Sequence, residues 1–180
     1  MKLIHAFLRI NLIKDQKLYF KYIFKSKTNK KQKKVEDYSI IMTVITKNLQ
    51  IKSKRENDII DLTEQTSKVV KESKIENGIV IVFVAGSTAA ITTIEYEPGL
   101  QKDFPKMLSR IAPKDIEYDH DKTWHDGNGH SHVRASLIGP SLTIPFKEGH
   151  LMLGTWQQIV LLEMDARPRE RAIILQIMGE

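Results

Sequence analysis

The hydrophobic residues along this chain fall into two kinds of pattern. Short runs rich in β-branched residues are typical of strands, and they occupy residues 43–51, 79–85, 88–97, 141–146, 151–163 and 171–178. The run at 79–85 is apolar without a break, which predicts a strand covered on both faces. A turn at 147–149 predicts that the strands on either side of it form a hairpin.

Two other segments repeat their apolar residues with helical spacing. The first is expected to begin at Asp58 and to end at Gly78, since glycine favours the left-handed conformation that terminates helices. The second covers 100–111, and Pro105 is compatible with it only if the helix begins near Asp103. Two clear helices that do not alternate strictly with the strands predict an α+β fold.

Residues 117–132 are polar and contain glycine, which predicts a loop, and residues 133–138 are a candidate for a short helix. The loop holds four of the six histidines of the chain, which are His120, His125, His130 and His132. A neutral imidazole binds a divalent metal ion through one ring nitrogen, so a loop that folds back on itself can build a metal site. The alternative is an exposed polar loop without a ligand.

The chain has no cysteine, so a metal ion here would have only nitrogen and oxygen ligands. The same absence excludes disulfide bridges, a zinc ribbon and a thiol nucleophile. A nitrogen-rich set favours zinc, and nickel, copper and manganese are also compatible with it. Asp119, Asp121 and Asp126 are available to complete a shell or to orient a ligating ring.

Two further segments are candidates for holding phosphate. Ser87 and Thr88 follow the apolar strand, where hydroxyl and backbone N–H groups can bind an anion, and an ordinary strand break is the alternative. Arg167, Arg169 and Arg171 would share one face of a strand and could clamp a phosphate. Exposed charge before an edge strand is the competing interpretation of the arginines.

Two polar residues beside aromatic ones are also singled out. Glu95 precedes Tyr96 on a predicted strand and is a candidate general base, with a solvated surface charge as the alternative. Gln157 follows Trp156, which we expect in the core or at an interface. A glutamine amide that is buried needs hydrogen-bond partners, so the surroundings of Gln157 matter.

The charge of the chain is divided between two unlike parts. The 180 residues carry a net +6, but residues 1–36 hold eleven Lys and Arg against two acidic residues, and the rest carries a net −3. We therefore predict a basic extension over 1–41 followed by one domain over 42–180. Charged residues interrupt the apolar runs of the extension too often for a membrane span or a secretory signal.

Three interpretations of the extension remain open. It is a basic arm for nucleic acid or an anionic membrane surface, a helix packed on the domain through Leu3, Phe7 and Ile10, or sequence upstream of a true start at Met42. Residues 25–36 lack the apolar groups needed to offset the entropy of ordering and are expected to be disordered. Apart from this arm, nucleic acid is not expected as a partner.

Several motifs together resemble those of the YjbQ-like family, also called secondary thiamine-phosphate synthase. They are GSTAAITTIE, YDH, GNGHSHVRASLIGPSLTIPF, GHLMLGTWQQIVLLEMD and RPRERAIILQIMG. The likeness runs from about residue 42 to the C-terminus. It implies a compact α+β domain with a β-sandwich-like sheet core and a few packed helices, and a homotrimer with sites near its subunit interfaces. We also expect a cytoplasmic location, which fits the lack of cysteine.

The resemblance implies roles for particular residues. His120 and His132 match histidines of the family, whereas Asn128 and His130 match a branch that carries GNGHSH. Many members have a histidine where this chain has Gly86, and His130 is the substitute that we expect.

We therefore expect a small-molecule enzyme that depends on a divalent metal, with zinc favoured. The residues expected to hold the metal are His120, His130 and His132. Those expected to hold the substrate phosphate are Ser87, Thr88, Arg169 and Arg171. Those expected to act in catalysis are Asn128, Gln157 and Glu95. The activity that the resemblance implies joins a pyrimidine methyl diphosphate to a thiazole phosphate. The alternatives are a non-catalytic trimer that binds a metal or metabolite, and binding of anionic surfaces through residues 1–36.

Overall fold

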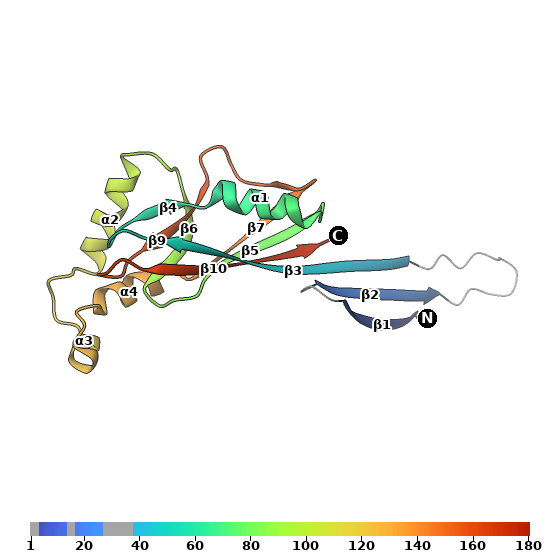
Figure 1. Ribbon diagram of the computed structural model, residues 1–180, viewed down its shortest axis with the longest axis horizontal. Helices are drawn as coiled ribbons and strands as arrows, with labels where there is room; N and C mark the ends of the chain where they lie inside the picture. The colour runs from blue at the N-terminus through green and yellow to red at the C-terminus, as the bar shows by residue number, and fades with distance from the viewer. Residues whose placement is uncertain (1–3, 14–16, 27–37) are drawn as a thin grey trace, which may run out of the picture.

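The structure is a computed structural model that describes residues 4–13, 17–26 and 38–180 (Figure 1). Its strands are β1 Ile4–Ile13, β2 Lys17–Ser26, β3 Tyr38–Lys52, β4 Ile59–Asp61, β5 Gly78–Val84, β6 Ala89–Ile94, β7 Ser141–Lys147, β8 His150–Leu151, β9 Gln158–Glu163 and β10 Glu170–Gly179. Its helices are α1 Thr63–Ser73, α2 Leu100–Ile111, α3 Asp119–Trp124 and α4 Gly129–Ile138. This is the α+β class expected from the sequence.

The strands form two antiparallel sheets that pack face to face. The larger sheet has seven strands in the order β1-β2-β3-β10-β5-β7-β8, and the smaller has three in the order β4-β9-β6. Alternate residues of β5 and β10 point between the sheets and are buried, among them Val82, Leu175 and Ile177. They pack with Ile159 and Leu161 of β9, so apolar burial between the sheets forms the main core.

A second, smaller core lies on the outer face of the three-stranded sheet. Val160 and Leu162 of β9 point away from the first core and pack with Leu108 of α2 and Ala135 of α4. The domain therefore has three layers, with the small sheet between the large sheet and these helices. Figure 1 shows α3 projecting from the end of the domain at which α2 and α4 lie. No helix among the described residues is long and apolar enough to cross a bilayer.

The pairing of β6 with β9 separates two groups of predicted site residues. Ala89 lies opposite Glu163 at one end of this pair, and Ile94 lies opposite Gln158 at the other. Residues near position 88 therefore meet residues near 165, close to α3 and α4. Glu95 and Gln157 lie at the other end, about 20 Å away along a six-residue strand.

The first predicted helix begins and ends at other residues than expected. Residues 59–61 form β4, which pairs with β9, because the two isoleucines of this segment extend an apolar edge of the small sheet. Helix α1 begins only at Thr63, whose backbone N–H donates to the side chain of Asp61. It ends at Ser73 rather than at Gly78, and Lys74 takes the left-handed conformation with φ 60°.

The second helix also begins earlier than expected. Helix α2 begins at Leu100, so Pro105 lies inside it rather than in its first turn. The reason is the side chain of Glu97, which accepts hydrogen bonds from the backbone N–H groups of Gly99 and Leu100. This carboxylate caps the helix ahead of the position at which the proline suggested a start.

Three further expectations were wrong. The loop expected at 117–132 contains α3 and the beginning of α4. The hairpin turn at Glu148 and Gly149 is present, but β8 has only two residues, and β9 belongs to the other sheet. Strand β5 is fully buried on one face only, because Ile79 on its other face is 36% exposed.

The N-terminal extension is not a helix where it is described. Residues 4–13 and 17–26 are the antiparallel strands β1 and β2, and β2 pairs with β3, so the extension adds two strands to the large sheet. The disorder expected at 25–36 lies mostly outside the described residues, and Lys25 and Ser26 end β2. The basic arm, the start at Met42 and the division at residue 42 stay predictions.

Candidate functional site

Two of the predicted histidines form a pair between α3 and α4. His120 lies in the first turn of α3 and His132 in α4, and their ring centroids are 4.2 Å apart with planes tilted by 43°. The positive φ of His125, 52°, ends α3, and that of Gly127, 65°, turns the chain back toward α4. The predicted folding back of this segment is therefore present, and it brings two imidazoles together.

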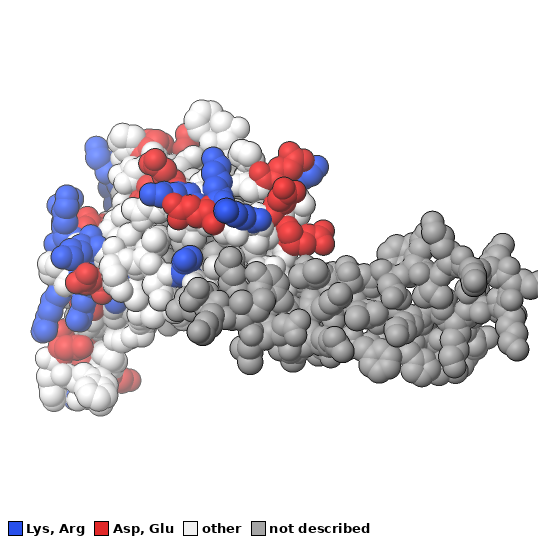
Figure 2. Space-filling model, turned by 45° about the vertical axis from the view of Figure 1, so that its right-hand side comes forward, with Lys and Arg blue, Asp and Glu red and all other residues white. Residues whose placement is uncertain are grey.

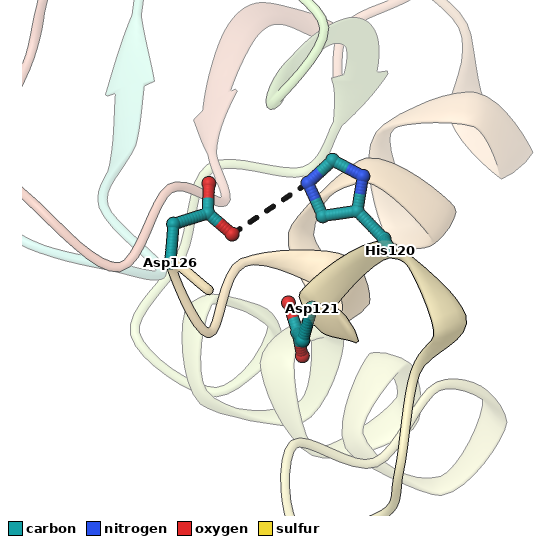
Figure 3. A group of neighbouring side chains, drawn as sticks. All are labelled: His120, Asp121 and Asp126. Carbon is teal, nitrogen blue, oxygen red and sulfur yellow. Dashed lines mark ion pairs between the residues drawn. The ribbon is translucent and has the colours of Figure 1, made fainter. Parts of the chain in front are cut away.

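Carboxylates lie close to the ring of His120. Its Nε2 atom is buried, has no hydrogen-bond partner among the described residues, and lies 3.6 Å from Oδ1 of Asp126. Ligand atoms of His120, Asp121 and Asp126 all lie within 4.8 Å of one another. In Figure 3 the His120 ring and the Asp126 carboxylate face each other, and Asp121 lies below them. We call His120, His132, Asp121 and Asp126 the histidine–aspartate cluster.

A glycine holds α3 against α4. A Cβ atom on Gly129 would stand 2.4 Å from the Cβ of Tyr118, so only glycine fits this contact. The backbone N–H of Gly129 donates to Oδ1 of Asp121 at 2.9 Å, which fixes that carboxylate at the first residue of α4. The GNG motif thus sets the spacing of the two helices that carry the paired histidines.

The surroundings of His132 favour its neutral form. Burial and the neighbouring His120 lower the pKa of His132 below its usual 6.5, and they outweigh the carboxylates of Asp126, Asp165 and Asp121, which raise it. A neutral imidazole has a lone pair available for a metal ion.

His130 belongs to a different cluster. It lies two residues before His132 on α4 and therefore points to the other side of the helix. Its ring is 1% exposed, and its Nε2 lies 3.0 Å from Oε1 of Glu56. The buried Arg134 also donates to Oε1 of Glu56, at 3.1 Å, and Lys114 donates to Oε2 at 2.7 Å. The structure thus does not bring the three predicted metal-ligating histidines together.

Asp165 joins most of the other predicted residues. Its Oδ2 accepts hydrogen bonds from Thr88 at 2.9 Å, Asn128 at 3.2 Å and Arg169 at 2.8 Å. Burial would raise the pKa of Asp165, but these bonds and the backbone N–H of Arg167 lower it to about 2. Asp165 is therefore a permanent negative charge beside the histidine–aspartate cluster.

The guanidinium of Arg171 is hydrogen-bonded to buried groups of the protein. It donates to both carboxylate oxygens of Glu163 and to the hydroxyl of Thr88, and both Arg171 and Glu163 are buried. A Cβ atom on Gly86 would stand 2.9 Å from Nη1 of Arg171, so this guanidinium also fills the space beside Gly86. Arg169, with 44% of its side chain exposed, is the more accessible of the two arginines predicted to bind phosphate.

The remaining predicted residues lie on the surface. Ser87 is exposed beside the buried Thr88. Glu95 and Gln157 are exposed at the far end of the small sheet, and Gln157 accepts a hydrogen bond from Gly154 N–H at 2.7 Å. Trp156 is 69% exposed and is not part of the core of this chain. The expected interface role of Trp156 stays a prediction.

Sequence reasoning did not single out Glu163, Asp165 or Glu56. A signal for the first two existed, because they are the only acids at the end of the apolar run IVLLEMD, and alternation places both on one face. Glu56 gave no signal, because it lies in a charged stretch in which nothing sets it apart from its neighbours. Its partly buried position depends on contacts with His130 and Arg134 of α4, about 75 residues later.

The charges of the site suit a cation. Asp121, Asp126 and Asp165 surround two imidazoles, whereas Arg169 is already paired with Asp165. An isolated phosphate would meet these carboxylates and be repelled, but a divalent cation would be attracted by them. Two ligands bound tetrahedrally to zinc at about 2.1 Å stand about 3.4 Å apart. The 3.6 Å between His120 Nε2 and Asp126 Oδ1 is close to that spacing.

A known protein family matches most of this chain. The model of the YjbQ-like UPF0047 proteins matches residues 47–180. A UPF0047 protein of Methanothermobacter thermautotrophicus is 40% identical over 141 residues, which are 78% of this chain and 96% of that protein. The UPF0047 protein YugU of Bacillus subtilis is 32% identical over 134 residues, which are 74% of this chain and 98% of YugU.

Solved structures give the same result. A crystal structure of a YbjQ-like protein of unknown function from Sulfolobus solfataricus superposes with a TM-score of 0.73 at 36% identity, covering 77% of this chain and 99% of that one. An uncharacterised YjbQ/UPF0047 protein from Clostridium acetobutylicum superposes with a TM-score of 0.66 at 35% identity, covering 72% and 98%.

Proposed function

The chain belongs to the YjbQ-like UPF0047 family, and on that premise we propose that its histidine–aspartate cluster binds a divalent metal ion for chemistry on a small phosphorylated molecule. The observation that carries the proposal is the buried Nε2 of His120, which faces Asp126 and finds no hydrogen-bond partner in the described part of the chain. Burying such an atom without a partner costs about 1–3 kcal/mol, and a metal ion would remove that cost.

The ligand set differs from the one predicted by histidine spacing. His120 and Asp126 are the proposed central ligands, with His132 and Asp121 beside them. On the other face of α4, the ring of His130 is hydrogen-bonded to Glu56, so His130 is proposed as a structural residue. Nitrogen and oxygen donors of this kind suit zinc, and they also suit manganese or nickel.

Several residues around the ion would bind and orient a substrate. The ionised Asp165 fixes the side chains of Asn128 and Thr88, so the remaining amide N–H of Asn128 keeps a constant direction. Arg169 is the cation best placed to meet a phosphate, because its side chain is partly exposed. A bound divalent ion would supply the positive charge that a phosphate needs among these carboxylates.

The finer hypothesis concerns thiamine phosphate. In that reaction the nitrogen of a thiazole phosphate attacks the methylene carbon of a pyrimidine methyl diphosphate. A C–N bond forms, the C–O bond to the diphosphate breaks, and pyrophosphate leaves with the electron pair. The two proposed contributions of this chain are Arg169, as a contact for the leaving diphosphate, and Asn128, as a hydrogen-bonding group for the pyrimidine.

Gln157 and Glu95 need a separate explanation, because they lie at the far end of the small sheet. In the homotrimer expected from the resemblance, a site at a subunit interface would combine residues of two chains, and we propose that these two residues act there. Light scattering would test the assembly. A trimer that Trp156→Ser dissociates supports the interface, whereas a monomeric wild-type protein refutes it.

Metal content tests the proposal directly. Protein prepared with zinc and then dialysed is expected to keep about one ion per chain, measured by plasma emission. His120→Ala should lose most of it, whereas His125→Ala, an exposed histidine of the same segment, should keep it. Equal metal content in the wild type and His120→Ala would refute the assignment.

Substrate assays separate an enzyme from a binding protein. Metal-loaded protein is incubated with the pyrimidine diphosphate and the thiazole phosphate, and released pyrophosphate is measured. Release that Arg169→Gln reduces at least tenfold, with metal content unchanged, supports catalysis at this site. Normal metal content without release of pyrophosphate supports the non-catalytic alternative.

A further inference from the structure

An open pocket of about 560 Å³ lies beside the small sheet, and none of its lining residues belongs to the histidine–aspartate cluster. The end of β3, the segment before β4, β4 itself, the turn after β6 and the first turn of α2 form its walls. Neither the sequence motifs nor the proposed function uses this pocket. Its volume is within the range of pockets that hold small ligands.

The rim of the pocket is basic. Lys52, Lys54, Arg55 and Lys102 line it, and Asp58 is the one carboxylate in its wall. Asp58 is already engaged, because its Oδ2 accepts the backbone N–H of Lys54 at 2.6 Å and its Oδ1 lies 3.8 Å from Arg55. Within the part of the chain that is described, none of the three lysines has a carboxylate within 4.0 Å.

The floor of the pocket is apolar and contains an aromatic ring. Ile59, Ile60 and Pro98 line it together with Tyr96, which is 38% exposed. The hydroxyl of Tyr96 donates to the carbonyl of Ile59 at 3.1 Å, and its backbone N–H donates to the side chain of Gln158 at 2.9 Å. The ring is therefore held in place rather than free on the surface.

The segment that carries the cations is anchored on both sides. The backbone N–H of Ser53 donates to the carbonyl of Arg169 at 2.9 Å, and that of Asn57 donates to the carbonyl of Glu163 at 2.8 Å. Between them, Glu56 points inward and binds His130 and Arg134. Lys54 and Arg55 consequently project from a fixed backbone, which lowers the entropic cost of ligand binding.

We propose that this pocket binds a small organic phosphate. Its phosphate would lie among Lys52, Lys54, Arg55 and Lys102, and its apolar body would lie on Tyr96. Figure 2 shows Lys and Arg side chains at the left-hand end of the domain, with Asp and Glu side chains among them. The combination of a cationic rim with a fixed aromatic floor favours a free phosphorylated molecule with a flat apolar part over inorganic phosphate. This proposal does not depend on a metal at the histidine–aspartate cluster.

Calorimetry with phenyl phosphate tests the proposal on the full chain. Binding is expected with a dissociation constant below about 1 mM, at least tenfold tighter than that of inorganic phosphate. The double variant Lys54→Gln/Lys102→Gln should weaken it at least tenfold. The control Lys68→Gln/Lys71→Gln removes the same charge from the exposed face of α1 and should change it less than twofold. Equal loss in both double variants would mean diffuse attraction and would refute a site.

Two further arms identify the ligand class. Tyr96→Ala should weaken phenyl phosphate at least fivefold and leave inorganic phosphate unchanged. Equal effects on both ligands would refute the role of the aromatic floor.

Vesicles of phosphatidylserine and phosphatidylcholine test whether the pocket binds a lipid headgroup instead of a free small molecule. Vesicle binding that is lost in Lys54→Gln/Lys102→Gln, without binding of phenyl phosphate, would overturn the small-molecule assignment.

Discussion

The imidazole ring of His120 lies against that of His132, with the two centroids 4.2 Å apart. Two protonated rings at this distance would repel each other, and His120 is one of the causes that lower the pKa of His132. This pair gives the cluster its nitrogen donors, and the carboxylates around it favour a cation.

We expect His132 of the metal-free protein to titrate below pH 6.5. Burial and His120 lower its pKa, whereas Asp126 opposes them, so Asp126→Asn should lower it further. Nuclear magnetic resonance of the imidazole signals across pH 4–8 measures both values. Titration of His132 above 6.5, or a higher value in Asp126→Asn, would contradict the described surroundings.

The second prediction concerns the buried pair Glu163–Arg171. Arg171→Leu leaves a buried carboxylate without its cation, which is expected to lower the free energy of unfolding by about 3–5 kcal/mol. Removing both charges with Glu163→Leu/Arg171→Leu should restore much of this loss. The exposed Arg167→Leu serves as the control and should change stability by less than about 0.5 kcal/mol. Urea unfolding gives these values, and a loss below about 1 kcal/mol for Arg171→Leu would refute the account.

Acid should weaken the protein through Asp165. Its pKa is lowered from 3.8 to about 2, so its stabilising contribution is complete above pH 4 and is lost as pH falls toward 2. The shift corresponds to about 2 kcal/mol. Asp165→Asn should be less stable at pH 7 and should lose less between pH 4 and pH 2 than the wild type. Urea unfolding at pH 7, 4, 3 and 2 measures this, and identical slopes would contradict the prediction.

The contact of Gly129 with Tyr118 gives a prediction about packing. Gly129→Ala places a methyl group 2.4 Å from the Cβ of Tyr118, so α3 must move away from α4. We expect a loss of about 1–3 kcal/mol in thermal unfolding, together with changed imidazole signals of His120 and His132. Ser136→Ala, on the exposed face of α4, should have little effect. Unchanged stability in Gly129→Ala would mean that this contact does not hold the helices.

The α+β class, the last strand β10 and helix α2 could be predicted from the hydrophobic pattern alone. The pattern failed where a distant partner decides the structure. The apolar residues at 59–61 share one helical spacing with those of α1, but pairing with β9 makes 59–61 a strand. Likewise, the side chain of Glu97 caps α2 ahead of Pro105, and the spacing of hydrophobic residues does not predict such a hydrogen bond.

The candidate site could be predicted in part. The density of histidines pointed to the segment that holds the His120–His132 pair, and Thr88, Asn128 and Arg169 meet at one place. The H-x-H spacing grouped His130 with His132, but the structure places the two rings on opposite sides of α4. Residues two apart on a helix face different ways, and the segment was expected to be a loop. Asp165 was missed because its role depends on partners from three separate parts of the chain.

The most direct test of the account is X-ray diffraction from zinc-loaded crystals, recorded on both sides of the zinc absorption edge. The account predicts one strong anomalous peak per chain within about 2.3 Å of His120 Nε2 and of an Asp126 oxygen. It predicts no peak at that place in crystals of His120→Ala. A strong peak elsewhere in the chain, with none beside His120, would contradict the central claim.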